Sequence, residues 1–372
     1  MITGIEYVDY IEKITPLLFV DEAPLVRIGG VLKVKSPLDL MNQVIDYIPQ
    51  SQIDTFKDII ELILQDDDPE AKEKMDITTL RWWQNKQMFS GNIKEGVFQS
   101  LTLLAIVQSR IHSRTNWIEK FVDDKLKDFD IKRYLTHKCN LHWLAEASPS
   151  SFLKFIKNDI KSGSVLLNQL MEVKHKDLSI IGSEIYYAEL LFILEALAWD
   201  EQYLLEVTSI LMYLCSYPNN SNYSNKPKNS LIQIYRFILP QTYTPFESRL
   251  KVLKTLSSTY QNLIFELCVD ILDGIKNRTF TYNSHFRWRM REKKESPQYI
   301  RPINENNVIA ISQLMFETSS FSHEEIWKMV YLSFDKNMTC CRSKILDVVN
   351  GYKNQLKGNN EFVENLRKEI NK

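Results

Sequence analysis

Histidine and cysteine side chains lie close together in the stretch HKCNLH, which runs from His137 through Cys139 to His142. Imidazole and thiolate are zinc ligands, but structural zinc sites commonly pair two ligand clusters at recognisable spacings. The sequence supplies no second pair, so ordinary packing beside Trp143 is the favoured interpretation. The vicinal pair Cys340 and Cys341 is equally weak as a metal signal. We therefore predict no metal ligands and no cofactor.

Other patterns that could carry catalysis are incomplete. The glycines of GNIKEG, from Gly91 to Gly96, are not followed by the Lys-Ser/Thr pair of a phosphate-binding loop, so the stretch is interpreted as a helix start. The acidic run Asp66 to Asp68 is interpreted as a solvated loop. Glu189 and Glu195 lie about 120° apart around their helix, so each is expected to hydrogen-bond a neighbouring element instead. With no GxSxG nucleophile motif either, we predict that the chain is not an enzyme.

One segment, residues 276–301, departs from the neutral average of the chain. It carries eight basic and two acidic residues, a net charge of +6, interleaved with Phe280, Tyr282, Phe286 and Trp288. Three interpretations are open: an irregular connection whose aromatic side chains pack on the helical body, a surface that binds a protein, or a surface that binds nucleic acid. The candidate partner-binding residues are Arg287, Trp288, Arg289 and Arg291.

Length and composition narrow the class of protein. The chain has 372 residues, a formal net charge of −1, 44% hydrophobic residues and 25% charged residues. These values exclude collagen-like and highly charged disordered chains. The near-zero net charge also does not provide the overall basic field that a dedicated nucleic-acid binder has. The most apolar stretch, Tyr186 to Trp199, contains two glutamates and is too short to span a bilayer. The five cysteines and the acidic start, which lacks a signal-peptide pattern, indicate a reduced, cytoplasmic protein.

The elements that must position these residues are mostly helical. With only 10 glycines and 12 prolines, the long periodic stretches predict an all-α fold, an irregular α-solenoid or helical array. Gly29-Gly30 between two apolar runs predicts one small β-hairpin at 25–35. Expected helix starts are the caps Ser36-Pro37 and Ser148-Pro149, the Ser51/Asp54 pair, and capping boxes at 244–247 and 322–325. Further helices are expected at 93–111, 117–129, 183–199, 201–217 and 263–275.

The composition also suggests a division of the chain. We predict an N-terminal helical array over residues 1–217, a polar loop over 218–229, and a C-terminal helical part over 230–372 that contains the basic-aromatic loop 276–301. The helix at 183–199 is apolar on nearly every side, so we expect it near the centre of the fold.

Several segments follow one another in the order VLKVKSPLDLMNQVIDYI, QDDDP, FSGNIKEGVFQSLTLLA, LHWLAEASPSSFLKFI, ELLFILEALAWDEQYLLEVTSILMYL and NKPKNSLIQIYRFILPQTYTPFESRLKVL. From near Leu25 to near Ile275, this succession resembles the helical C-terminal sensor region of large bacterial STAND-type NTPases, many of which are antiphage defence proteins. The resemblance implies a helical array that recognises a phage protein. The chain lacks a Walker A sequence, an ATPase domain and an effector, so signalling would require a separate chain or further sequence.

Two functional hypotheses follow. The first is a non-enzymatic recognition or scaffold module of a bacterial antiphage system, whose partner is a phage protein or a separate NTPase or effector chain. The alternative is a helical protein that binds nucleic acid through residues 276–301, with an affinity that falls steeply as salt rises. The resemblance carries no short target-contact motif, so it assigns no residue of this chain to the contact.

Overall fold

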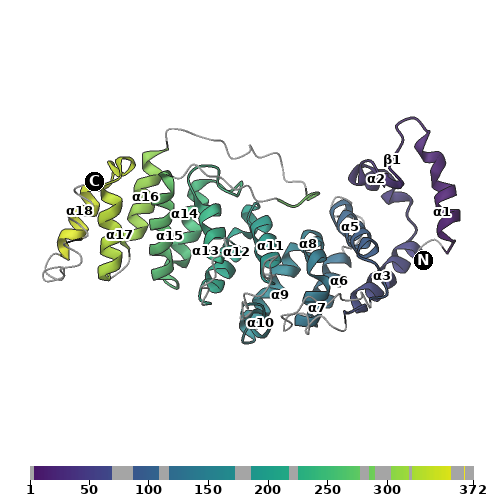
Figure 1. Ribbon diagram of the computed structural model, residues 1–372, viewed down its shortest axis with the longest axis horizontal. Helices are drawn as coiled ribbons and strands as arrows, with labels where there is room; N and C mark the ends of the chain where they lie inside the picture. The colour runs from purple at the N-terminus through teal and green to yellow at the C-terminus, as the bar shows by residue number, and fades with distance from the viewer. Residues whose placement is uncertain are drawn as a thin grey trace. The chain divides into compact units, whose positions relative to one another are not determined.

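The computed structural model describes residues 4–68, 87–108, 117–171, 186–217, 225–276, 285–289, 303–317 and 321–352, together with residue 364. Within these ranges the chain is mostly α-helical and has one two-stranded antiparallel hairpin near the N-terminus (Figure 1). The predicted fold class is confirmed, whereas the predicted solenoid arrangement stays a prediction.

The chain divides into two compact units. Unit 1 comprises residues 1–189 and 286–290, and unit 2 comprises residues 190–285 and 291–372. This division lies within helix α11 (Ala188–Leu197), upstream of the polar loop at which the sequence suggested a boundary. Helix α13 begins at Pro227, within the range 218–229 that the sequence suggested as a polar loop.

Unit 1 contains the hairpin and the first helices of the chain. Its elements are α1 (Tyr7–Ile14), η1 (Thr15–Leu18), β1 (Leu25–Ile28), β2 (Val31–Val34), α2 (Pro37–Val44), η2 (Ile45–Tyr47), α3 (Gln50–Gln65), α5 (Gly91–Gln108), α6 (Trp117–Leu126), α7 (Ile131–His137), η3 (Lys138–Asn140), α8 (Leu141–Ala147), α9 (Pro149–Lys161) and α10 (Val165–Met171).

Two glycine-dependent features that the sequence predicts for unit 1 are present, a hairpin turn and a helix end. Leu25 pairs with Val34 and Ile28 with Val31, and Gly29 has the positive φ of +60° that this tight turn requires. Helix α9 begins at Pro149, and Gly163 adopts a φ of +101° just past its end. The hairpin and this helix are therefore confirmed.

Helix α5 is the core helix of unit 1. It packs against α2, α3, α6 and α8, and both of its sides are buried, including Phe98 and Leu101. It starts at Gly91, as the helix-start interpretation of the glycine stretch requires. The sequence placed Lys94 at the exposed start of this helix. That prediction is wrong, because the Lys94 side chain is almost fully buried.

The acidic run before α5 explains the burial of Lys94. Asp66 accepts hydrogen bonds from the backbone amides of Met88 and Phe89 and pairs with the Lys94 ammonium at 2.9 Å. Lys94 Nζ also donates to the Asp66 carbonyl at 3.0 Å. The solvated-loop interpretation of Asp66 is therefore wrong: its carboxylate joins the end of α3 to the start of α5.

Unit 2 is built from helices that pack in chain order. Its elements are α11 from residue 190 onward, α12 (Glu201–Leu214), α13 (Pro227–Tyr235), α14 (Phe246–Ser257), α15 (Gln261–Asp273), η4 (Gly274–Lys276), α16 (Glu305–Phe316), α17 (His323–Ser333), η5 (Lys336–Met338) and α18 (Arg342–Gly351). Figure 1 shows α12 to α17 side by side. Helix α12 packs on α13 and α14, α15 packs on α13, α14, α16 and α17, and α17 packs on α18.

The two capping boxes predicted for this part of the chain have different outcomes. At 322–325, the Glu325 amide donates to the Ser322 hydroxyl and the Glu325 carboxylate accepts from the Ser322 amide, so this box is confirmed. At 244–247 the prediction is wrong. Pro245 occupies the N-cap of α14, and the Thr244 amide instead donates to the Thr242 hydroxyl in a local turn.

The two glutamates of α11 behave as expected. Glu195 is buried and accepts a hydrogen bond of 2.6 Å from the Ser230 hydroxyl on α13. Burial raises the pKa of Glu195, and the Ser230 hydrogen bond opposes this shift. Glu189 lies 3.5 Å from the His142 ring on α8. Each carboxylate therefore contacts a neighbouring element, and the two do not act as a pair.

Candidate functional site

Residues 286–289 of the basic-aromatic loop belong to unit 1, where Trp288 and Arg289 contact helix α8. Residues 286–289, which we call the docked segment, include Trp288, whose indole stacks on Trp143 with ring centroids 4.9 Å apart and an interplanar angle of 24°. Only 7% of Trp288 is exposed. Burial of two facing indoles contributes both area and favourable ring geometry to this contact.

A buried carboxylate completes the attachment of the docked segment. Glu146, near the end of α8, accepts hydrogen bonds from the backbone amides of Trp288 at 2.5 Å and Arg289 at 2.7 Å. The Arg289 guanidinium in turn donates to the carbonyls of Glu146 at 2.9 Å and Ala147 at 3.1 Å. These are the last carbonyls of α8, where a cation interacts favourably with the helix dipole.

The four candidate partner-binding residues therefore occupy different environments. Trp288 and Arg289 make their contacts within unit 1. This is what we expect if the loop is an irregular connection packed on the helical body. Arg287 is exposed, with its guanidinium 5.0 Å from the centroid of the Trp288 ring. Arg291 lies outside the described residues, as do the other members of the loop except Lys276, His285 and Phe286. Partner binding by these residues stays a prediction.

Replacing Glu146 with glutamine is expected to lower the free energy of unfolding by about 2 kcal/mol, because a neutral amide accepts the two backbone hydrogen bonds more weakly than a carboxylate. Hydrogen exchange should show faster exchange at the amides of Trp288 and Arg289. Glu95→Gln is the matched control, since Glu95 is exposed on α5. Unchanged protection of both amides in Glu146→Gln would contradict this role.

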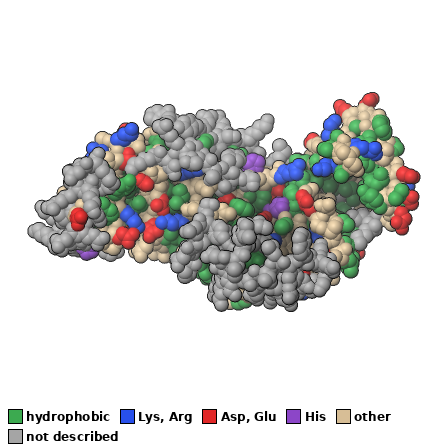
Figure 2. Space-filling view, viewed as in Figure 1, with side chains coloured by type: hydrophobic (Ala, Val, Ile, Leu, Met, Phe, Trp, Pro, Cys, Tyr) green, Lys and Arg blue, Asp and Glu red, His purple; other side chains and the backbone are tan. Residues whose placement is uncertain are grey.

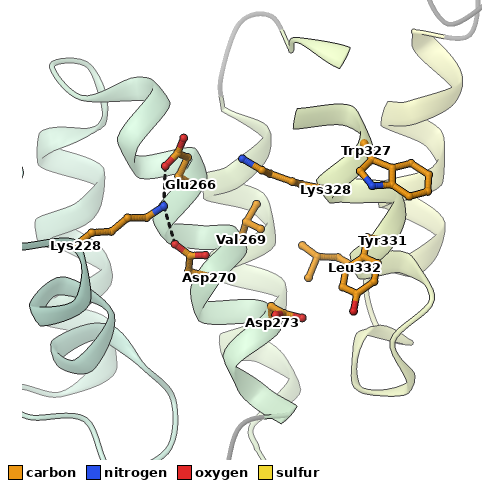
Figure 3. A pocket seen from close by; sticks show the side chains of 9 residues that line it. All are labelled: Lys228, Glu266, Val269, Asp270, Asp273, Trp327, Lys328, Tyr331 and Leu332. Carbon is orange, nitrogen blue, oxygen red and sulfur yellow. Dashed lines mark hydrogen bonds and ion pairs between the residues drawn. The ribbon is translucent and has the colours of Figure 1, made fainter. Parts of the chain in front are cut away.

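A second site is a groove on unit 2 between α13, α15 and α17. Figure 3 shows the side chains that line it, and its volume is about 290 Å³. One wall is acidic and comes from one face of α15, and the opposite wall is aromatic and comes from α17. The lining residues are Lys228, Glu266, Val269, Asp270, Asp273, Trp327, Lys328, Tyr331 and Leu332.

The acidic wall is organised by one lysine. Lys228 on α13 donates to Glu266 at 2.7 Å and pairs with Asp270 at 2.9 Å, as the dashed lines of Figure 3 show. Partial burial disfavours the charged ammonium, but the hydrogen bonds to the two carboxylates outweigh it and raise the pKa of Lys228. Asp273 lies one turn further along α15 and is exposed. The ion pairs hold the carboxylates of Glu266 and Asp270 in fixed positions.

The aromatic wall is formed by Trp327 and Tyr331, one turn apart on α17. Tyr331 is 42% exposed, and Lys328 between them pairs with Glu324 at 2.9 Å. A groove of about 290 Å³ lies at the small end of ligand pockets, a size that suits one or two side chains. Its described lining contains no histidine, cysteine or serine that could act as a nucleophile or base.

Comparison with known proteins does not identify this site. No protein family, curated protein or solved structure matches the chain.

The groove was not predicted from the sequence. One signal of it is present there: Glu266, Asp270 and Asp273 are spaced i, i+4 and i+7, which places three carboxylates on one helical face. The spacing of Trp327 and Tyr331 likewise places them on one face of α17. What the sequence does not show is that these two faces and Lys228 meet, because that depends on how α13, α15 and α17 pack.

The weak metal candidates are separated in the structure. His137 is buried, Cys139 is exposed, and the His142 ring packs on Trp143 with centroids 4.3 Å apart. All five cysteines are free thiols, and burial is the main cause that raises the pKa of Cys341 to about 11. Among the residues that the structure describes, no group of three or more histidine, cysteine or acidic side chains could hold a metal ion.

Within the described ranges, no helix combines the length and the apolar character needed to cross a bilayer.

Proposed function

We propose that this chain is a non-enzymatic recognition module that binds a protein partner through the groove of unit 2. The observation that carries the proposal is that an acidic face of α15 and two aromatic side chains of α17 meet in one groove. Aromatic residues are enriched among the side chains that contribute most to protein interfaces, and fixed carboxylates give orientation to a charged partner group.

The chemistry of the groove favours a basic side chain of the partner. An arginine fits best, because its planar guanidinium can stack on an aromatic ring and donate two parallel hydrogen bonds to a carboxylate. Asp273 is the exposed acid at the end of the acidic wall, and Tyr331 is the more exposed ring. Since Lys228 already pairs with Glu266 and Asp270, we expect the partner's arginine to bind beside this lysine rather than to displace it.

The resemblance to the sensor regions of STAND-type NTPases suggests which partner this is. On that basis we propose that the module belongs to a bacterial antiphage system and that its partner is a phage protein. Binding would act by differential affinity: a target that favours the active arrangement of a complete assembly shifts its population only by the difference in affinity between the states.

A peptide-display selection on the full chain tests the groove directly. We expect the selected peptides to contain arginine next to an aromatic or apolar residue. Their affinity, measured by titration with fluorescently labelled peptide, should fall at least about tenfold in Tyr331→Ala and in Asp273→Asn, because each removes a central contact.

Tyr47→Ala is the matched control, since Tyr47 is 84% exposed on unit 1 and distant in sequence from the groove. It should leave peptide affinity unchanged. Peptides that bind wild type, Tyr331→Ala and Asp273→Asn equally would show that the groove is not the contact surface. In that case, phage-challenge experiments with these variants should also show no loss of protection.

A further inference from the structure

The first elements of unit 1 form an arm that has no hydrophobic core of its own. The arm comprises α1, η1, β1 and β2, residues 6–35. None of residues 4–44, all of which the structure describes, is buried, and the first buried side chain is Ile45. An eight-residue helix and a two-stranded hairpin are each marginal in water without packing partners.

The arm exposes nine large hydrophobic side chains. Figure 2 shows hydrophobic side chains on this part of unit 1, at the right of the view, with acidic side chains at its outer edge. Tyr7 is 75% exposed, Phe19 is 83% exposed and Ile28 is 59% exposed. The other large hydrophobic side chains exposed on the arm are Val8, Tyr10, Leu17, Val20, Val31 and Val34. Such a concentration of apolar surface is typical of an interaction site.

The charges of the arm are divided between its two halves. Residues 6–22, which contain α1 and η1, carry five acids and one base, a net charge of −4. Residues 25–35, which contain the hairpin, carry Arg27, Lys33 and Lys35 and no acid, a net charge of +3. Each half therefore has the charge and the apolar surface that the other half would bind.

The register of the hairpin places these features on one face. Ile28 pairs with Val31, and Val26 pairs with Lys33. Because side chains alternate along a strand, these four lie on the same side of the hairpin. Ile28, Val31 and Lys33 are exposed, so this face offers two apolar side chains beside a positive charge. An acidic amphipathic helix is the complementary surface.

We propose that the arm is a dimerisation element, in which α1 of one copy of this chain packs on the exposed hairpin face of a second copy. In a twofold arrangement each contact occurs twice, so the acidic half and the basic half of both arms are paired at once. A second copy is the occupant that the charge division favours, because one arm contains both complementary surfaces. This inference is independent of the groove in unit 2.

Sedimentation velocity on the full chain tests the proposal. We expect wild type to sediment as a dimer of the 43.8 kDa chain at micromolar concentrations. The double substitution Ile28→Thr and Val31→Thr should raise the dimer dissociation constant at least about tenfold. Both positions are exposed and threonine suits a strand, so the fold should be retained, which circular dichroism checks.

A charge exchange supplies a second, independent measurement. Lys33→Glu should weaken the dimer, and adding Glu12→Lys to it should restore part of the lost affinity, because the opposite charges are exchanged between helix and hairpin. Leu62→Thr is the control, since Leu62 is 53% exposed on α3 outside the arm. A wild-type chain that stays monomeric, or a dimer that tolerates Ile28→Thr with Val31→Thr, would overturn the proposal.

Discussion

Replacing Asp66 with alanine is expected to lower the free energy of unfolding by about 3–5 kcal/mol, because it breaks a nearly buried ion pair and leaves one charge behind. Among the described residues, the one acceptor left to the Lys94 ammonium would be the backbone carbonyl of residue 66, which lies 3.0 Å away in wild type. The amides of Met88 and Phe89 would lose their acceptor as well. Urea unfolding followed by circular dichroism measures the loss.

Two variants separate the buried charge from other effects of the substitution. The double variant Asp66→Asn with Lys94→Met keeps the approximate volumes and buries no charge, so it should be more stable than Asp66→Ala. Asp54→Ala is the matched surface control, because Asp54 pairs with Lys57 at 3.0 Å on the exposed side of α3. Its effect should be small. Equal losses in Asp66→Ala and Asp54→Ala would contradict a structural role for the Asp66–Lys94 pair.

The local features of this fold were predictable because each depends on a few neighbouring residues. Gly29 and Gly30 determine the hairpin turn, and Ser322 with Glu325 determines the start of α17. The helical spacing of apolar residues in α5 could also be recognised in the sequence. The failure at 244–247 has a local cause too, since the Thr242 hydroxyl competes for the Thr244 amide and Pro245 takes the cap position.

The contacts that connect elements were not predictable, because their partners are far apart in the sequence. Asp66 and Lys94 are 28 positions apart, and Glu146 and Trp288 are 142 positions apart. A lysine or glutamate on an otherwise apolar helix face has the same sequence signature whether it is solvated or buried with a partner. The groove follows the same rule: the acidic spacing on α15 is local, but its apposition to Trp327 depends on helix packing.

A buried histidine next to the Asp66–Lys94 pair provides a pH-dependent test of unit 1. The His137 side chain is fully buried, and its ring lies 6.1 Å from Phe98 and 6.0 Å from Phe129, measured between centroids. Neither ring nitrogen has a hydrogen-bond partner of ordinary geometry among the described residues. Burial is the main cause that lowers the pKa of His137 from 6.5 to about 4. The Lys94 and Arg133 charges act in the same direction, whereas the Leu64 carbonyl and the Asp66 carboxylate oppose them.

The stability of wild type is therefore expected to fall by about 3 kcal/mol as the pH falls from 6.5 to about 4, and to be independent of His137 above pH 6.5. In that window the unfolded chain binds a proton at this imidazole and the folded chain does not. Asp66 acts in a lower window. Burial alone would raise the pKa of Asp66, but the amides of Met88 and Phe89 and the Lys94 ammonium have the larger combined effect and lower it below 3.8. The contribution of Asp66 to the unfolding free energy is therefore lost only below pH 3.8.

Urea unfolding of wild type and His137→Leu over this pH range isolates the histidine, because leucine fills a similar apolar site and does not titrate. The difference in unfolding free energy between the two proteins should change steadily between pH 6.5 and about 4. His142→Leu is the control for replacing an imidazole with leucine, since His142 is partly exposed beside Glu189. Parallel curves for wild type and His137→Leu would show that the His137 ring takes up its proton equally in the folded and unfolded chains, and hence that its burial does not exclude the charge.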